Sequence, residues 1–253
     1  MAEQQPILLE VRGLTRRFGG VTALADVSFG VAAGSITSLI GPNGAGKTTL
    51  FNVVTGILSP TSGQVVFDGR DVTGWAAHRL ARAGLARTFQ NLRLFGTLTA
   101  RENVIAALGG RLNHGLLGAL RRSSDPLLVN EAERILAFTG LEAHADELAQ
   151  ELPYGLQRRL ELARAMALEP RLLLLDEPTA GLVQAEIEDL LRLIDGLRQR
   201  GVTVLLIEHN MALVMGHSDH VVVLDHGAKI AEGDPSTVAA DPKVIEAYLG
   251  HED

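Results

Sequence analysis

The chain has 253 residues and a net charge of −7, and 46% of its residues are hydrophobic. This length and composition are sufficient for one large α/β domain with a sizeable core. The negative charge and the scattered arginines disfavour nucleic acid as a partner, because nucleic-acid binding requires a basic surface. The absence of cysteine excludes disulfides, thiolate zinc sites and a cysteine nucleophile.

The sequence has no feature that predicts export or membrane insertion. Its first residues, Met1 to Pro6, lack the charged and apolar regions of a signal peptide. No apolar run approaches the roughly 20 residues that span a bilayer. We therefore expect a soluble chain, and any function at a membrane requires a partner that contributes the membrane-spanning part.

The first part of the chain is predicted to be rich in β-structure. Alternating apolar residues predict strands within residues 7–35. Phe18 lies between two of these strands, and its ring either belongs to a plain hairpin or stacks on adenine. We favour stacking because of the motif that follows. Beyond that motif, Gln64–Phe67 is a predicted strand that ends at the Asp68-Gly69 turn.

The motif itself is a complete P-loop, Gly41-x-x-x-x-Gly46-Lys47-Thr48. It lies between a predicted strand at Ile36–Ile40 and a predicted helix at Thr49–Leu58, so that backbone N–H groups and the positive end of the helix favour a bound phosphate. Lys47 is expected to neutralise the β- and γ-phosphates, and Thr48 to hold Mg²⁺. The predicted nucleotide-binding residues here are Gly41, Pro42, Asn43, Gly44, Ala45, Gly46, Lys47, Thr48 and Thr49.

The remaining elements follow from hydrophobic periodicity and from turn signals. Residues 75–85 and 127–138 are predicted helices, Thr99 and Glu102 form a capping box that starts another helix, and 109–126 is a helical excursion with a loop. A later helix is predicted with Pro153 at its first position. Strands at Leu172–Leu175 and Val202–Ile207 follow, with a helix at about 184–200 between them. The chain then forms a hairpin of Val221–Leu224 and Ala228–Ala231 and a last helix from Asp241 to Gly250.

Together these elements predict one domain of the α/β class. It contains a P-loop NTPase core with a parallel sheet, an antiparallel β subdomain and a helical insertion. Both ends of the chain contribute to the core, at about 1–89 and 166–253. The helical subdomain is predicted to occupy about 90–165.

Polar residues that suit nucleotide hydrolysis follow the predicted strands. Leu172–Leu175 leads directly to Asp176, which is predicted to bind Mg²⁺, and to Glu177, which can polarise an attacking water. His209 follows the next strand, where a side chain faces the ligand crevice of an open parallel sheet and can contact the γ-phosphate. Gln90, at the border of the insertion, is suited to contact Mg²⁺ or the water.

The segment from Leu152 to Arg159 could be no more than the start of an amphipathic helix. Together with the P-loop, Gln90, the Asp176-Glu177 pair and His209, in this order and spacing, it resembles the signature sequence of ATP-binding cassette (ABC) proteins, usually Leu-Ser-Gly-Gly-Gln. The resemblance covers nearly the whole chain. The residues in the signature position are Pro153, Tyr154, Gly155, Leu156 and Gln157.

The resemblance implies an ATPase subunit that binds ATP with Mg²⁺ and dimerises head to tail. Each ATP would lie between the P-loop of one subunit and the signature of the other. Hydrolysis would drive transport through separate permease subunits, at the cytoplasmic face of the inner membrane. We expect the second ATPase subunit to be a different chain, with a homodimer as the alternative, and a periplasmic binding protein to take part indirectly.

Within this family, the chain resembles the branched-chain amino acid uptake ATPases. The similar segments are 87–95, the signature with Arg158–Glu161, 109–126 and Ala247–Gly250. Urea-type importers and the lipopolysaccharide-export ATPase share parts of this pattern and remain alternatives. A soluble cassette protein acting on ribosomes would contain two cassettes, and one acting on DNA ends a long coiled coil. A P-loop kinase would leave the signature unexplained.

Two residues depart from the family pattern. Pro153 replaces the signature serine, whose hydroxyl would reach the γ-phosphate of the facing site. Val183 stands where the family usually carries Asp, or Asn in this branch. We therefore expect this chain to contribute weakly to the ATP site that its signature faces, while its own P-loop, Glu177 and His209 are intact.

Overall fold

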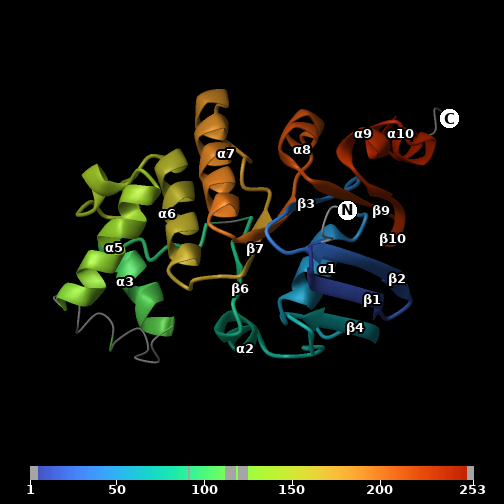
Figure 1. Cartoon of the computed structure of the whole chain (residues 1–253), viewed down its shortest axis with the longest axis horizontal. Helices are drawn as coiled ribbons and strands as arrows, with labels where there is room; N and C mark the ends of the chain where they lie inside the picture. The colour runs from blue at the N-terminus through green and yellow to red at the C-terminus, as the bar shows by residue number, and fades with distance from the viewer. Residues whose placement is uncertain (1–4, 91, 112–117, 119–124, 250–253) are drawn as a thin grey trace.

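The structure is a computed structural model that describes residues 5–90, 92–111, 118 and 125–249. Its centre is a six-stranded sheet in the order β10-β9-β3-β8-β7-β6 (Figure 1). All neighbouring pairs from β9 to β6 are parallel, and β10 pairs antiparallel with β9. The strands are β3 (Ile36–Ile40), β6 (Leu85–Arg87), β7 (Leu172–Asp176), β8 (Thr203–Ile207), β9 (His220–Asp225) and β10 (Ala228–Gly233).

A second, antiparallel sheet has the order β2-β1-β4-β5. Its strands are β1 (Ile7–Phe18), β2 (Val21–Ala32), β4 (Ser62–Phe67) and β5 (Arg70–Asp71). Helix α1 (Lys47–Val54) packs with both sheets, and its Leu50 and Phe51 are fully buried in their common core. The predicted parallel and antiparallel sheets are therefore both present, and they share one apolar interior.

The leucines of β7 explain why this strand is apolar on both faces. Leu172 and Leu174 belong to the core that includes α1, whereas Leu173 and Leu175 belong to the core that includes α7 (Gln184–Gln199). Successive side chains of a strand point to opposite faces, so a central parallel strand covered on both sides requires a continuous apolar run.

The helical unit has a core of its own. It comprises α3 (Ala100–Arg111), α5 (Pro126–Phe138), the 3-10 turn η1 (Glu142–His144) and α6 (Tyr154–Met166), and it lies at the opposite end of the molecule from the antiparallel sheet (Figure 1). The predicted capping box is confirmed, because the Thr99 N–H donates to Glu102 at 2.9 Å and the Glu102 N–H donates to the Thr99 hydroxyl at 3.1 Å. Most of the predicted excursion at 109–126 lies outside the described residues.

Four shorter helices complete the described chain. Helix α2 (Ala77–Arg82) precedes β6. Helices α8 (Met211–His217), α9 (Pro235–Ala239) and α10 (Pro242–Leu249) cover β9 and β10 near the C-terminus. Helices α8 and α9 were not predicted from the sequence, since neither is long enough to show a helical apolar period. Their N-cap residues, Asn210 and Asp234, are the local signals that could have located them.

Three predicted helices have wrong boundaries. The helix predicted at 75–85 is α2, which ends at Arg82, because Gly84 with a φ of +97° turns the chain into β6. Pro153 is not the first residue of α6 but its N-cap, because its ψ of 149° is extended rather than helical. Helix α1 ends at Val54 instead of Leu58, and Gly56 with a φ of +70° turns the chain away. Within the described residues, no helix is long and apolar enough to cross a bilayer.

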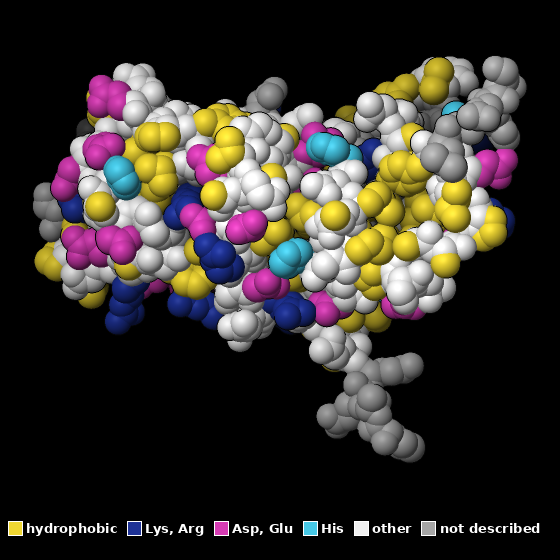
Figure 2. Space-filling model, turned by 90° about the horizontal axis from the view of Figure 1, so that it is seen from above, with side chains coloured by type: hydrophobic (Ala, Val, Ile, Leu, Met, Phe, Trp, Pro, Cys, Tyr) yellow, Lys and Arg dark blue, Asp and Glu magenta, His cyan; other side chains and the backbone are white. Residues whose placement is uncertain are grey.

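Seen from above, the two ends of the molecule differ in the kinds of side chain on their surface (Figure 2). Acidic and basic side chains lie side by side over the helical unit, and hydrophobic side chains are more numerous toward the opposite end. On this face, charges of both signs are therefore interspersed instead of forming one basic stripe.

Candidate nucleotide site

The P-loop joins the end of β3 to the start of α1. The Lys47 ammonium donates to the carbonyls of Gly41 at 2.6 Å and Pro42 at 2.9 Å, so the side chain lies across the loop. Burial lowers the pKa of Lys47, and the carboxylates of Glu177 and Asp176 oppose that shift. Gly46 has a φ of +100°, and a Cβ there would lie 2.6 Å from the Ala23 carbonyl oxygen, which restricts this position to glycine.

The start of α1 has the features of an anion site. No side chain caps this helix, and its first turn contains no acidic residue, so its N–H groups and positive end are left for a ligand. Thr48 is exposed at the same place. In the part of the chain that the structure describes, no three His, Cys, Asp or Glu side chains gather into a ready-made metal site. A metal ion held jointly by phosphate oxygens, the Thr48 hydroxyl and the Asp176 carboxylate fits these residues.

Asp176 lies at the end of β7 and is paired with an arginine that the sequence analysis did not select. The Arg87 guanidinium donates to the Asp176 carboxylate at 2.8 Å, and the two side chains are 7% and 5% exposed. Arg87 also donates to Asn52 at 2.7 Å and to the Thr55 hydroxyl at 3.2 Å. The arginine therefore connects β6, the P-loop helix and the end of β7.

Glu177 follows in an unusual backbone conformation. Its φ of 48° is left-handed, which is rare for a residue other than glycine, and its N–H donates to the Ile207 carbonyl at 3.0 Å. The Gln90 side-chain amide donates to the Glu177 carboxylate at 3.1 Å. The structure thus brings together two residues that are 87 positions apart in the chain, both of which the sequence predicted for the site.

The end of β8 supplies a further carboxylate that sequence reasoning missed. Glu208 is fully buried, and it accepts hydrogen bonds from the Thr179 hydroxyl at 2.5 Å and the Thr179 N–H at 3.3 Å. The backbone N–H of His209 donates to the same carboxylate at 3.2 Å. The His209 imidazole is exposed and has no hydrogen bond within the described residues, so its role at the γ-phosphate stays a prediction.

The signature packs against the segment that follows Glu177. A Cβ on Gly155 would lie 2.3 Å from a Glu186 carboxylate oxygen, so any larger residue where α6 meets the start of α7 would displace the Glu186 side chain. That carboxylate also accepts from the Val183 N–H at 3.1 Å. Pro153 is exposed, and the Val183 side chain is 65% exposed. Among the described residues, no hydrogen bond joins the signature to the P-loop of the same chain.

Phe18 ends β1 with its side chain 43% exposed. The Arg16 guanidinium lies 4.5 Å from the centre of the ring. An exposed aromatic ring suits stacking on adenine, and this assignment stays a prediction.

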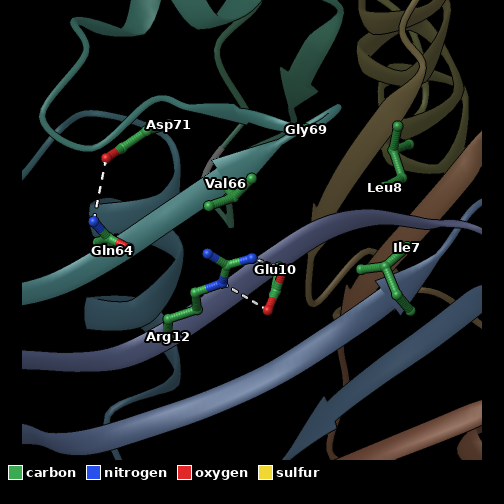
Figure 3. A pocket seen from close by; sticks show the side chains of 8 residues that line it. All are labelled: Ile7, Leu8, Glu10, Arg12, Gln64, Val66, Gly69 and Asp71. Carbon is green, nitrogen blue, oxygen red and sulfur yellow. Dashed lines mark hydrogen bonds and ion pairs between the residues drawn. The ribbon is translucent and has the colours of Figure 1, made fainter.

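Two hollows on the surface differ in whether predicted site residues line them. One of about 760 Å³ adjoins the P-loop and is lined by Pro42–Ala45, Asp225, His226, Ile230, Lys243, Glu246 and Ala247. The other, of about 330 Å³, lies on the antiparallel sheet and contains none of the predicted site residues (Figure 3). Its charged groups pair with one another, since Arg12 donates to Glu10 along β1 at 2.7 and 2.6 Å.

P-loop proteins hold a nucleoside triphosphate with a strand-loop-helix unit, a buried lysine and carboxylates at the ends of neighbouring parallel strands. This chain has the same arrangement, which places it in that class. Its family follows from comparison with known proteins. The sequence model described as ABC transporter matches residues 24–180, and the one described as branched-chain amino acid ATP-binding cassette transporter matches residues 228–253. The chain belongs to the ABC transporter family and is an ATPase subunit of that family.

Individual relatives cover nearly the whole chain. The high-affinity branched-chain amino acid transport ATP-binding protein BraF of Pseudomonas aeruginosa is 48% identical over 249 residues, which are 96% of this chain and 98% of the relative. The structure of the ADP conformation of an ABC transporter cassette superposes with a TM-score of 0.87 at 34% identity, covering 98% of this chain and all of that one. A dimeric cassette bound to ADP and Pi superposes with a TM-score of 0.78 at 25% identity, over 90% of this chain and 99% of that one.

Proposed function

We propose that this chain is the ATPase subunit of an importer for branched-chain or related amino acids. Two findings support this substrate class. The BraF relative, named for branched-chain amino acid transport, is similar over nearly its whole length. The C-terminal segment 228–253 also matches a sequence model described by the same substrate. The subunit itself would contact ATP and its protein partners rather than the amino acid.

The hydrogen bond between Gln90 and Glu177, beside the P-loop, is the observation that carries the proposed chemistry. Glu177 acts as the general base that takes a proton from the attacking water, and Gln90 orients its carboxylate. Lys47 and the N–H groups of the loop hold the phosphates, Phe18 stacks on adenine, and His209 contacts the γ-phosphate. Thr48, Asp176 and Gln90 hold Mg²⁺, which neutralises phosphate charge when it is bound.

The proposed assembly places two cassettes head to tail beneath membrane-spanning permease subunits, at the cytoplasmic face of the inner membrane. The dimeric cassette bound to ADP and Pi supports the pairing of two cassettes. Signature residues 153–157 would face the partner's ATP, and the helical subdomain of about 90–165 would carry them. A periplasmic binding protein would deliver the amino acid to the permease.

We favour a different ATPase as the second subunit because of Pro153 and Val183. Pro153 has no hydroxyl for the facing γ-phosphate, and the neighbouring Tyr154 hydroxyl does not replace it. That hydroxyl donates to the Ala180 carbonyl at 3.2 Å and accepts from Arg158 at 2.7 Å, within the same chain. A homodimer would carry this deficiency at both sites, whereas a partner with a serine signature would leave the site of Lys47 and Glu177 fully equipped.

Uptake by cells tests the substrate class. In a strain that lacks the gene for this chain, we expect uptake of radiolabelled leucine, isoleucine and valine at submicromolar concentration to fall. The intact gene should restore it, and a gene with Lys47→Ala should not. Unchanged leucine uptake together with lost urea uptake would support the urea-type alternative. A defect in the outer membrane with normal uptake of both would support lipopolysaccharide export.

A further inference from the structure

Arg158 of α6 holds the segment that carries Gln90. Its guanidinium donates to the Phe89 carbonyl at 3.2 Å and to the Gln90 carbonyl at 2.7 Å. Glu161, one turn later, accepts from the Phe89 N–H at 3.1 Å and pairs with Arg158 at 3.3 Å. The side chains of Arg158 and Glu161 are 4% and 9% exposed. Burial strengthens such charged hydrogen bonds, so they hold the backbone at 89–90 against α6, the helix that begins at the signature.

Tyr154 extends this connection to the signature and beyond it. The Arg158 Nη2 that donates to the Gln90 carbonyl also donates to the Tyr154 hydroxyl, with both distances 2.7 Å. The hydroxyl in turn donates to the Ala180 carbonyl at 3.2 Å, and the Ala180 N–H donates to the Glu177 carbonyl at 3.2 Å. A Cβ on Gly181 would lie only 3.1 Å from the Tyr154 ring, so the ring packs directly on this segment.

These contacts form a closed circuit that starts and ends at the proposed catalytic base. From the Glu177 carboxylate it passes through the Gln90 amide, the Gln90 carbonyl, Arg158, Tyr154 and Ala180, and it returns to the Glu177 backbone. A single nitrogen atom joins the Gln90 side of the circuit to the signature side. Through the two hydrogen bonds of that nitrogen, the segment that carries Gln90 is joined directly to the start of α6.

We infer that Tyr154 and Arg158 are positioning residues that couple the chain's own nucleotide site to its signature. Through them, binding at the P-loop repositions the signature segment that faces the partner's ATP. This inference rests on the proposed function, which supplies both the ligand and the facing site. Neither residue is required to touch nucleotide at the P-loop of its own chain.

A spin label beside the signature tests the coupling in the full chain. The sequence contains no cysteine, so Glu151→Cys, an exposed turn position, accepts one nitroxide without other changes. Affinity is measured with mant-ATP and Mg²⁺, and label mobility with and without AMP-PNP and Mg²⁺, at a concentration where light scattering shows a monomer. The variants are Tyr154→Phe, which removes one hydroxyl, and Arg158→Gln. The control is Arg134→Gln, whose side chain on α5 is 81% exposed.

We expect AMP-PNP to change the label's mobility in the parent and the Arg134→Gln control. In Tyr154→Phe and Arg158→Gln this change should fall about fivefold or more, the usual scale of coupling between sites. The mant-ATP affinity of the chain's own P-loop should stay within about threefold, because in the monomer the signature faces no nucleotide. A purely structural role would lower the melting temperature without removing the nucleotide response. If Arg158→Gln does not fold, Tyr154→Phe decides the result.

The failures are distinguishable. A parent chain that does not bind mant-ATP would overturn the proposed function, and the coupling with it. Normal binding with no label response in the parent overturns the coupling alone. The same conclusion follows if the response persists unchanged in Tyr154→Phe.

Discussion

The guanidinium of Arg87 lies 2.8 Å from the carboxylate of Asp176, and both side chains are almost completely buried. The acid that is predicted to bind Mg²⁺ thus has a cationic partner supplied by the fold itself. Asp176 belongs to β7 and Arg87 to β6, which pair in parallel, so the sheet register brings the two charges together. The pair therefore stabilises the core and also lies in the predicted nucleotide site.

Removing the arginine should destabilise the protein strongly. In Arg87→Leu, Asp176 would remain buried without its partner, and we expect the free energy of unfolding to fall by about 3–5 kcal/mol. Urea denaturation followed by circular dichroism measures it. The matched control is Arg171→Leu, since Arg171 pairs with Asp68 where both side chains are about half exposed, and its loss should be much smaller. Equal losses in the two variants would show that burial does not set the strength of the Arg87 pair.

Two substitutions should separate binding from hydrolysis. Lys47→Ala removes the positive charge at the phosphates, and loss of one charged hydrogen bond alone weakens binding by roughly 10- to 100-fold. Glu177→Gln keeps the shape of the side chain but cannot act as a base, so ATP affinity should persist while turnover falls about 10²- to 10⁴-fold. Calorimetric ATP binding and phosphate release measure the two effects. Lys229→Ala, which removes a lysine paired with Glu232 on the β9–β10 hairpin, should change neither. Equal ATP affinity in wild type and Lys47→Ala would refute the P-loop assignment.

The hydrogen bond between Thr179 and Glu208 should contribute to stability. Thr179→Val leaves a buried carboxylate without its hydroxyl donor, and we expect the free energy of unfolding to fall by about 1.5–3 kcal/mol. Chemical denaturation measures the change, with Thr22→Val at an exposed position of β2 as the control. A loss no larger than that of the control would mean that Glu208 has another donor in solution.

The isolated chain should be mostly monomeric without nucleotide and a slow ATPase. Its proposed sites are completed by a facing subunit, and a net charge of −7 opposes self-association until ATP bridges the interface. Light scattering and turnover at a series of protein concentrations test this expectation. Fast turnover that does not depend on protein concentration would contradict it.

Restoring the family residues should reveal the two unequal ATP sites. In the assembled complex, the Pro153→Ser and Val183→Asn double variant should accelerate the site that the signature faces. The recovered hydrogen bond to phosphate corresponds to about 1.5–3 kcal/mol, or roughly ten- to a hundredfold. Glu177→Gln in the same complex should instead remove most of the turnover. If the restored residues leave the rate unchanged and Glu177→Gln also leaves most of it, the unequal sites do not exist.

The sequence alone predicted those residues of the site that belong to short contiguous motifs. The P-loop, Asp176 and Glu177 could be located because each lies directly after an apolar strand. Arg87, Glu208 and the Tyr154–Arg158 contacts were not assigned, since their roles depend on partners distant in the chain: Arg87 and Asp176 are 89 positions apart. Hydrophobic periodicity indicates that a residue lies in a sheet but not which strand becomes its neighbour.

The position of β3 in the sheet has a consequence for the order of events during synthesis. This strand, which ends at the P-loop, pairs on one side with β8 and on the other with β9, so both of its neighbours come from the last quarter of the chain. While the ribosome is still making the helical unit, β3 has no strand beside it. The strand that leads into the phosphate-binding loop is therefore paired only once residues near 223 have emerged, and we expect ATP to stabilise the nascent chain as a ligand only after that point.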